Sequence, residues 1–177
     1  MKKSILILVV LCIGALVRAQ EIKIAVSGGF PIGDFSDSNS FVLNAEGAYI
    51  FDVANQFAVG PSISVVHFFG KQFNSAEFGG FQNDDPLLFN RTISLDDTTF
   101  VPIGGTARFS ASESFILGVD VGYSIAVAPA LSEGGLYYKV QGIYMLSDKF
   151  GVKLSYAGII INPGTFTSLN LGIELSL

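Results

Sequence analysis

Apolar side chains alternate with polar or small ones along most of the chain after residue 20. In residues 41–51 the odd positions are apolar or small, whereas the even positions include Asn44 and Glu46. Successive side chains of a β-strand point to opposite faces, so a period of two predicts strands with one apolar face. The pattern predicts eight strands, which are residues 21–30, 41–51, 57–69, 99–110, 115–127, 136–146, 150–161 and 167–177.

The predicted connections alternate between short turns and longer loops. Small outer-membrane barrels have short periplasmic turns and longer outer loops, and their strands are alternating segments of about ten residues. We therefore predict an all-β fold: an eight-stranded antiparallel up-and-down transmembrane β-barrel over residues 20–177. The short links are residues 52–56, 111–114 and 147–149. The links rich in Pro, Gly, Asn, Asp and Ser are residues 31–40, 71–98, 128–135 and 162–166.

Composition agrees with a membrane location. Of 177 residues, 50% are hydrophobic and only 14% are charged, and the mean hydropathy is +0.53. Average globular domains have about 25% charged residues. So few charges would cover a water-facing shell poorly, which indicates that part of the surface faces lipid.

Residues 1–19 have the three zones of a cleaved secretory signal peptide. Lys2 and Lys3 precede an apolar run from Ile5 to Val17, and Val17-Arg18-Ala19 resembles a cleavage site. The run is shorter than the roughly 20 residues of a membrane-spanning helix. Cys12, the only cysteine, would be removed with this segment. Leu11 stands where a lipoprotein signal has a small residue, which disfavours acylation of Cys12.

Removal of the signal peptide would leave an acidic chain. The segment contains three of the ten basic residues and none of the fifteen acidic ones, so the net charge becomes 7 − 15 = −8. Nucleic-acid binding needs clustered Lys and Arg for phosphate contacts. The sequence therefore predicts no nucleic-acid partner.

The less apolar face of the predicted strands is expected to line the lumen. Its charges are few and nearly balanced, which suits pairing in the narrow interior of an eight-stranded barrel. Lys23 and Glu174 lie near the periplasmic ends of strands that must be neighbours, so we predict that they pair. The alternative is a soluble lipocalin-like carrier with an apolar ligand cavity. The predicted lumen charges are Lys23, Glu46, Arg108, Asp120, Lys139, Lys153 and Glu174.

Aromatic residues on the apolar face are predicted to form two belts at the membrane interfaces. Pro61 and Pro102 interrupt predicted strands, and each is expected to cause a bulge or an unpaired neighbour. The belt near the short turns comprises Phe51, Phe57, Phe109, Phe115, Tyr144 and Phe150. The outer belt comprises Phe30, Phe41, Phe69, Tyr123, Tyr138 and Tyr156.

With its signal peptide, eight alternating segments and alternating link lengths, the chain resembles small outer-membrane barrels of the OmpX and OmpA-barrel type, including Bacteroidetes-like barrel-domain proteins. The final strand, residues 167–177, keeps the hydrophobic spacing through Ile173 and Leu175. The resemblance implies that this strand is recognised by the barrel-assembly machinery, although Leu177 replaces the usual terminal aromatic residue. It also implies residence in the bacterial outer membrane, with outer-membrane lipids and lipopolysaccharide as partners.

The sequence indicates no catalytic, cofactor-binding or metal-binding residues. His67 is the only histidine, and Phe69 stands where lipid A deacylases of similar architecture have a serine two residues later. An interfacial position is expected for the His67 ring. The acidic residues of loop 71–98, Asn83-Asp84-Asp85 and Asp96-Asp97, do not have the spacing of an EF-hand.

We therefore expect a non-enzymatic integral outer-membrane protein with a structural or surface-interaction role. Loops present function on rigid scaffolds, so loop 71–98 is the main candidate for contact with a surface or host ligand. The alternatives are the lipocalin-like carrier and a lipid-modifying outer-membrane enzyme that uses His67.

Overall fold

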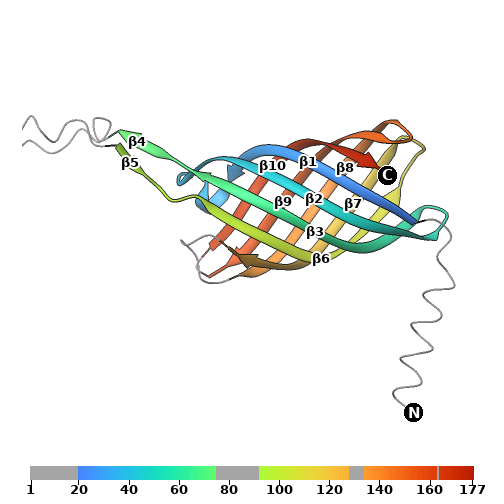
Figure 1. The fold of residues 1–177 in the computed structure, drawn as a ribbon, viewed down its shortest axis with the longest axis horizontal. Coiled ribbons are helices and arrows are strands. Elements are labelled where there is room, and N and C mark those ends of the chain that lie inside the picture. The colour runs from blue at the N-terminus through green and yellow to red at the C-terminus, as the bar shows by residue number, and fades with distance from the viewer. Residues whose placement is uncertain (1–19, 75–91, 128–133, 163) are drawn as a thin grey trace, which may run out of the picture.

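The described strands close into a barrel (Figure 1). The computed structural model describes residues 20–74, 92–127, 134–162 and 164–177, so the predicted signal peptide lies outside the described residues. The order of the eight barrel strands, all antiparallel, is β1-β10-β9-β8-β7-β6-β3-β2, and β1 pairs with both β2 and β10. The barrel strands are β1 (Gln20–Ile32), β2 (Asn39–Ala54), β3 (Phe57–Gly70), β6 (Thr98–Ser110), β7 (Phe115–Ala126), β8 (Gly135–Ser147), β9 (Phe150–Ile161) and β10 (Gly164–Ser176).

The predicted eight-stranded antiparallel barrel is confirmed, with strand ends that differ by a few residues. Alternation locates these strands well because a one-residue slip would move each apolar set to the inner face, and in every barrel strand except β3 it would also turn a buried charged side chain outward. A 3-10 helix, η1 (Gly33–Phe35), lies in the link between β1 and β2. Within the described residues, no helix has the length and hydropathy of a membrane span.

The prediction that residues 71–98 form a loop is wrong where this segment leaves the barrel. Near its two ends, β4 (Gln72–Asn74) and β5 (Thr92–Ser94) pair as a short hairpin, with Phe73 opposite Ile93. Thr, Ile and Phe favour strands, so pairing continues outward from β3 and β6. Figure 1 shows this hairpin projecting beyond one end of the barrel. Residues 75–91, with the Asn83-Asp84-Asp85 segment, lie outside the described residues.

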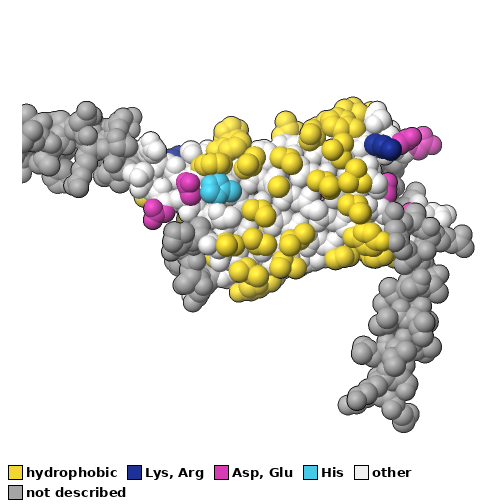
Figure 2. Space-filling view, viewed as in Figure 1, with side chains coloured by type: hydrophobic (Ala, Val, Ile, Leu, Met, Phe, Trp, Pro, Cys, Tyr) yellow, Lys and Arg dark blue, Asp and Glu magenta, His cyan; other side chains and the backbone are white. Residues whose placement is uncertain are grey.

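Side-chain polarity is that of a membrane barrel, apolar outside and charged inside. Leu171 and Val121, on outward positions, are 62% and 53% exposed, whereas Lys153 and Glu174, on inward positions, are 0% and 1% exposed. Figure 2 shows hydrophobic side chains scattered over the length of the barrel wall. The predicted assignment of the apolar phase to the outside is therefore confirmed.

Both prolines interrupt the pairing of β3, as predicted. The β2–β3 pairs run to Ala48–Ser62 and resume at Phe51–Val59, leaving out Pro61. The β3–β6 pairs run to Ile63–Ile103 and resume at Val66–Phe100, leaving out Pro102. The register is unchanged across each gap, so these are unpaired neighbours rather than bulges. A proline has no N–H to donate to the sheet.

The outer aromatic belt includes a row of rings that crosses the first three strands. Phe30 and Phe41 have ring centroids 6.1 Å apart, and so do Phe41 and Phe69. At the opposite end, Phe57 and Phe109 lie 4.8 Å apart. The ring of Phe41 also covers Gly28, where an added Cβ would lie 2.7 Å from the ring. Such rings fill the space that a strand glycine leaves on the lipid-facing surface.

Candidate functional site: the lumen and the outer end

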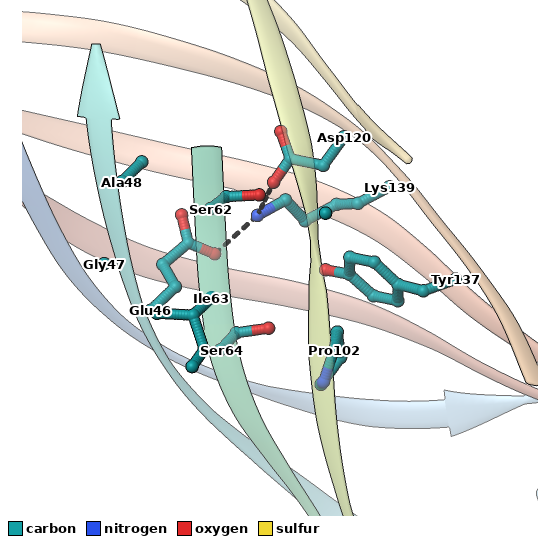
Figure 3. A pocket seen from close by; sticks show the side chains of 11 residues that line it. Glu46, Gly47, Ala48, Ser62, Ile63, Ser64, Pro102, Asp120, Tyr137 and Lys139 are labelled. Carbon is teal, nitrogen blue, oxygen red and sulfur yellow. Dashed lines mark hydrogen bonds and ion pairs between the residues drawn. The ribbon is translucent and has the colours of Figure 1, made fainter. Parts of the chain in front are cut away.

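The centre of the lumen contains an ion-pair network (Figure 3). Lys139 Nζ lies 2.5 Å from Glu46 Oε2 and 2.7 Å from Asp120 Oδ2. Lys153 Nζ also pairs with Glu46. β2 and β8 are four positions apart in the ring of eight strands, so the Glu46–Lys139 pair crosses the barrel. Because all four side chains are buried, this pairing is needed to offset the desolvation of their charges.

A second pair crosses the barrel in another direction. Arg108 on β6 pairs with Glu174 on β10, and these strands are also four positions apart. Gln141 Nε2 donates to Asp120 Oδ1 at 3.2 Å, so Gln141 also belongs to the network of Glu46, Lys139 and Asp120. The two groups together contain the cations Arg108, Lys139 and Lys153 and the anions Glu46, Asp120 and Glu174, so their formal charge is zero.

The predicted Lys23–Glu174 pair is wrong, although their strands are neighbours as expected. Lys23 lies opposite Ser176, and Glu174 lies opposite Ala25. Lys23 Nζ instead lies 2.6 Å from Ser176 Oγ and 2.5 Å from the half-exposed Glu21 carboxylate. This register leaves Glu174 to reach across the lumen to Arg108.

The lumen at the hairpin end is filled by aromatic rings, although the less apolar face of the strands was expected to line it. Phe68, Phe100 and Phe166 form a buried cluster with Val42, and Phe35 of η1 stacks on Phe166 with centroids 3.9 Å apart. Figure 1 places η1 at the same end as the projecting hairpin. The alternation could have revealed Phe68 and Phe100, since both lie on the inward phase. Phe35 lies outside a strand, and no periodicity indicates its position.

Hydrogen bonds hold the connections at this end together. The Asp34 carboxylate accepts from the Thr165 N–H at 3.0 Å. Lys71 Nζ donates to the Ser36 carbonyl at 2.9 Å, and the Lys71 N–H donates to the Ser38 carbonyl at 2.9 Å. The first connection is thus joined both to the start of β10 and to the base of the hairpin. Its contacts hold η1 over the aromatic cluster.

A cavity beside Lys139 is small. It has a volume of about 10 Å³ and is lined by residues that include Glu46, Asp120 and Tyr137 (Figure 3). This volume is at the lower limit for one water molecule. It does not suit the apolar ligand of a lipocalin-like carrier.

His67 lies on the outer surface near the end from which the hairpin projects, as expected for an interfacial ring (Figure 2). Its Nδ1 lies 2.8 Å from Thr99 Oγ1, and its Nε2 lies 3.6 Å from Asp97 Oδ2. Asp97 Oδ1 accepts from the Gly70 N–H at 2.9 Å. Sequence reasoning did not anticipate these partners, because they depend on the β3–β6 register that sets His67 opposite Thr99.

The described residues contain no group of three or more His, Cys, Asp or Glu side chains placed to hold a metal ion. Asp96 and Asp97, the acids of loop 71–98 that the structure describes, are both exposed. Asp97 contacts Gly70 and His67, so it fastens the base of the hairpin.

The comparison with solved structures supports the fold. No family model matches the sequence, and no curated protein matches it. The crystal structure of Ail, the attachment invasion locus protein of Yersinia pestis, has a TM-score of 0.54 at 14% identity, over 89% of this chain and 97% of that one. Ail in a phospholipid nanodisc has a TM-score of 0.52 at 15% identity, over 88% and 99%.

A designed transmembrane β-barrel is also similar, with a TM-score of 0.51 at 11% identity, over 89% of this chain and 95% of that one. At these identities the likeness concerns the fold. The chain thus has the fold of the small eight-stranded outer-membrane β-barrels.

Proposed function

We propose that this chain is a non-enzymatic integral protein of the bacterial outer membrane, of the OmpX and OmpA-barrel kind. The observation that carries the proposal is the polarity of the barrel. Exposed apolar side chains cover the wall, while paired charges lie buried in the interior. A soluble barrel with this exterior would expose an apolar surface far larger than monomeric proteins tolerate.

The proposed role is to present the outer connections to a surface or host molecule. The projecting β4–β5 hairpin and the hydrogen-bonded first connection support this role, because binding residues commonly lie on loops held by a rigid scaffold. The filled lumen argues against general solute transport, since an eight-stranded barrel encloses little more than its own side chains. Residues 1–19 would direct export, and the last strand would be recognised by the barrel-assembly machinery.

The first experiment tests membrane integration. The full chain is expressed in a Gram-negative host, its membranes are washed with alkaline carbonate, and the pellet is run on detergent gels with and without boiling. We expect a carbonate-resistant band whose migration changes on boiling, and mass spectrometry should find the chain cleaved after Ala19. Recovery in the soluble periplasmic fraction would contradict the proposal and favour the carrier.

A second experiment tests the orientation. An epitope inserted between Asp84 and Asp85 should bind antibody on intact cells, whereas the same epitope between Asn55 and Gln56, in the short β2–β3 turn, should bind only after permeabilisation. The reverse pattern would place the hairpin in the periplasm and remove the proposed surface role.

A further inference from the structure

A groove on the outer surface of the barrel lies beside the base of the hairpin. It is lined by Ser40, Phe41, Phe69, Gly70, Gln72 and Asp97, and its volume is about 610 Å³. These residues come from β2, β3, β4 and the segment just before β6. The groove is therefore formed where two barrel strands, the hairpin and the segment before β6 meet.

The groove combines apolar rings with oriented polar groups. The rings are Phe41 and Phe69, which belong to the row of the outer aromatic belt. The Asp97 carboxylate is fixed by the Gly70 N–H and faces His67, while its side chain is still 56% exposed. The Ser40 hydroxyl donates to the Phe69 carbonyl at 3.3 Å, which leaves its oxygen lone pairs available as acceptors.

The position of the groove indicates an occupant from the membrane. Along the wall from Phe41, Leu43 is an exposed apolar side chain on the outward face. On β3, the partly exposed His67 lies opposite Leu43, contacts the Phe69 ring and separates it from the exposed Val65. A molecule whose head lies between Phe41 and Phe69 could therefore lay an acyl chain along the wall. Small-molecule binding sites commonly combine an apolar contact area with a few polar groups that orient the ligand.

The charge around the groove disfavours a phosphate headgroup. Asp97 lines the groove, and Asp34, Asp37 and Asp96 are further acids exposed at this end of the barrel. Lys71, a described basic residue nearby, donates a hydrogen bond from its ammonium group to the Ser36 carbonyl. A head that donates hydrogen bonds to carboxylate, amide and hydroxyl oxygens fits these charges better than an anion.

We propose that this groove binds the sugar headgroup of an outer-leaflet glycolipid. The aliphatic face of a sugar packs on the Phe41 and Phe69 rings, and its hydroxyls donate to Asp97, Gln72 and Ser40. This inference rests on the proposed membrane location and adds to it a lipid class and a binding site.

The test uses protein expressed from the full chain, purified from membranes and placed in nanodiscs. The bilayer contains equal minor amounts of monoglucosyl-diacylglycerol, phosphatidylcholine and phosphatidylglycerol with the same acyl chains. Native mass spectrometry then measures which lipid stays bound. We expect at least about fivefold preference for the glucolipid, and no displacement by soluble maltose, because the acyl chain contributes to binding.

The variants F69A and D97N should each reduce glucolipid retention about tenfold, the expected cost of losing a ring contact or a charged hydrogen bond. F69L keeps the apolar bulk of the side chain but removes the ring, so it should still lose most of the preference for the glucolipid. The matched controls are Y123A, an aromatic residue of the outer belt outside the groove, and D37N, an exposed acid outside the groove. Both should retain the lipid within about twofold of the unchanged chain.

Equal retention of the three lipids, or a preference for phosphatidylcholine or phosphatidylglycerol, would overturn the inference. So would unchanged retention in F69L and D97N. Each sample is also run with and without boiling. If the unchanged chain is a heat-modifiable barrel but shows no preference for the glucolipid, only the proposed lipid site is refuted. If the unchanged chain also loses its resistance to carbonate, the proposed function is refuted as well.

Discussion

The centre of the lumen and its mouth at the hairpin end are filled by different kinds of interaction. In the centre, Glu46 bridges Lys139 and Lys153 across the barrel. At the mouth, Phe35, Phe68 and Phe166 pack as rings with little polar contact. The interior of a narrow barrel can thus be filled by paired charges in one region and by packed rings in another. The two regions should nevertheless respond differently to substitution, because a buried charge left alone costs more than a cavity.

The largest effect is expected from E46A. It removes the carboxylate shared by Lys139 and Lys153, so that Lys139 keeps only its pair with Asp120 and Lys153 loses its ion-pair partner. Breaking a buried pair by removing one partner costs about 3–5 kcal/mol of unfolding free energy. Urea unfolding in detergent micelles, followed by circular dichroism because the chain has no Trp, measures the loss. The exposed-acid variant D37A is the control, and a loss below about 1 kcal/mol would show that the network is dispensable.

At the mouth, F166A should cost about 3 kcal/mol, near the lower end for removing a buried Phe side chain. Phe166 contacts Phe35, Phe68 and Phe100, so the substitution opens a cavity in the cluster. The same unfolding assay is applied to F166L, which should recover most of the loss because it stays apolar. In the centre, E46Q should not recover most of the unfolding free energy that E46A loses. Equal recovery by F166L and E46Q would show that the mouth and the centre respond to substitution in the same way.

A smaller effect is expected from K23M. The partner of Lys23, Glu21, is half-exposed and can be hydrated when the ammonium group is removed. Ion pairs with one solvated partner contribute little to stability, so we expect K23M to lose at most about 1 kcal/mol of unfolding free energy. A loss of unfolding free energy as large as that of E46A would mean that the barrel end opposite the hairpin is as desolvated as the centre.

The smallest effect is expected from H67A. Its ring lies on the outer surface and contacts Thr99 and Phe69, so the unfolding free energy should change by about 0.5 kcal/mol. Mass spectrometry of lipid A from cells that express the unchanged chain or H67A should show identical spectra. A lipid A species that disappears in H67A would revive the lipid-modifying alternative.

The sequence predicted the strands because alternation, membrane polarity and turn composition all favour the same segments. It also predicted the gaps at Pro61 and Pro102, since these follow from the missing N–H. It did not predict the partner of Glu174, because strand register and tilt decide which side chains meet across the lumen. The ring of Phe35 and the groove at Phe69 and Asp97 depend on connections whose conformation has no periodic signal.

The cross-barrel pairs have a consequence for biogenesis. Glu46 and Arg108 lie on strands of the amino-terminal half, while their partners Lys139 and Glu174 lie on β8 and β10. A hairpin inserted alone would carry a bare charge into hydrocarbon, which is strongly unfavourable. We therefore expect neutralisation and closure to occur as one event and half-built intermediates to be short-lived in lipid. The chain should enter the membrane as an all-or-none unit, in which the cross-barrel charges meet as the seam between β1 and β10 closes.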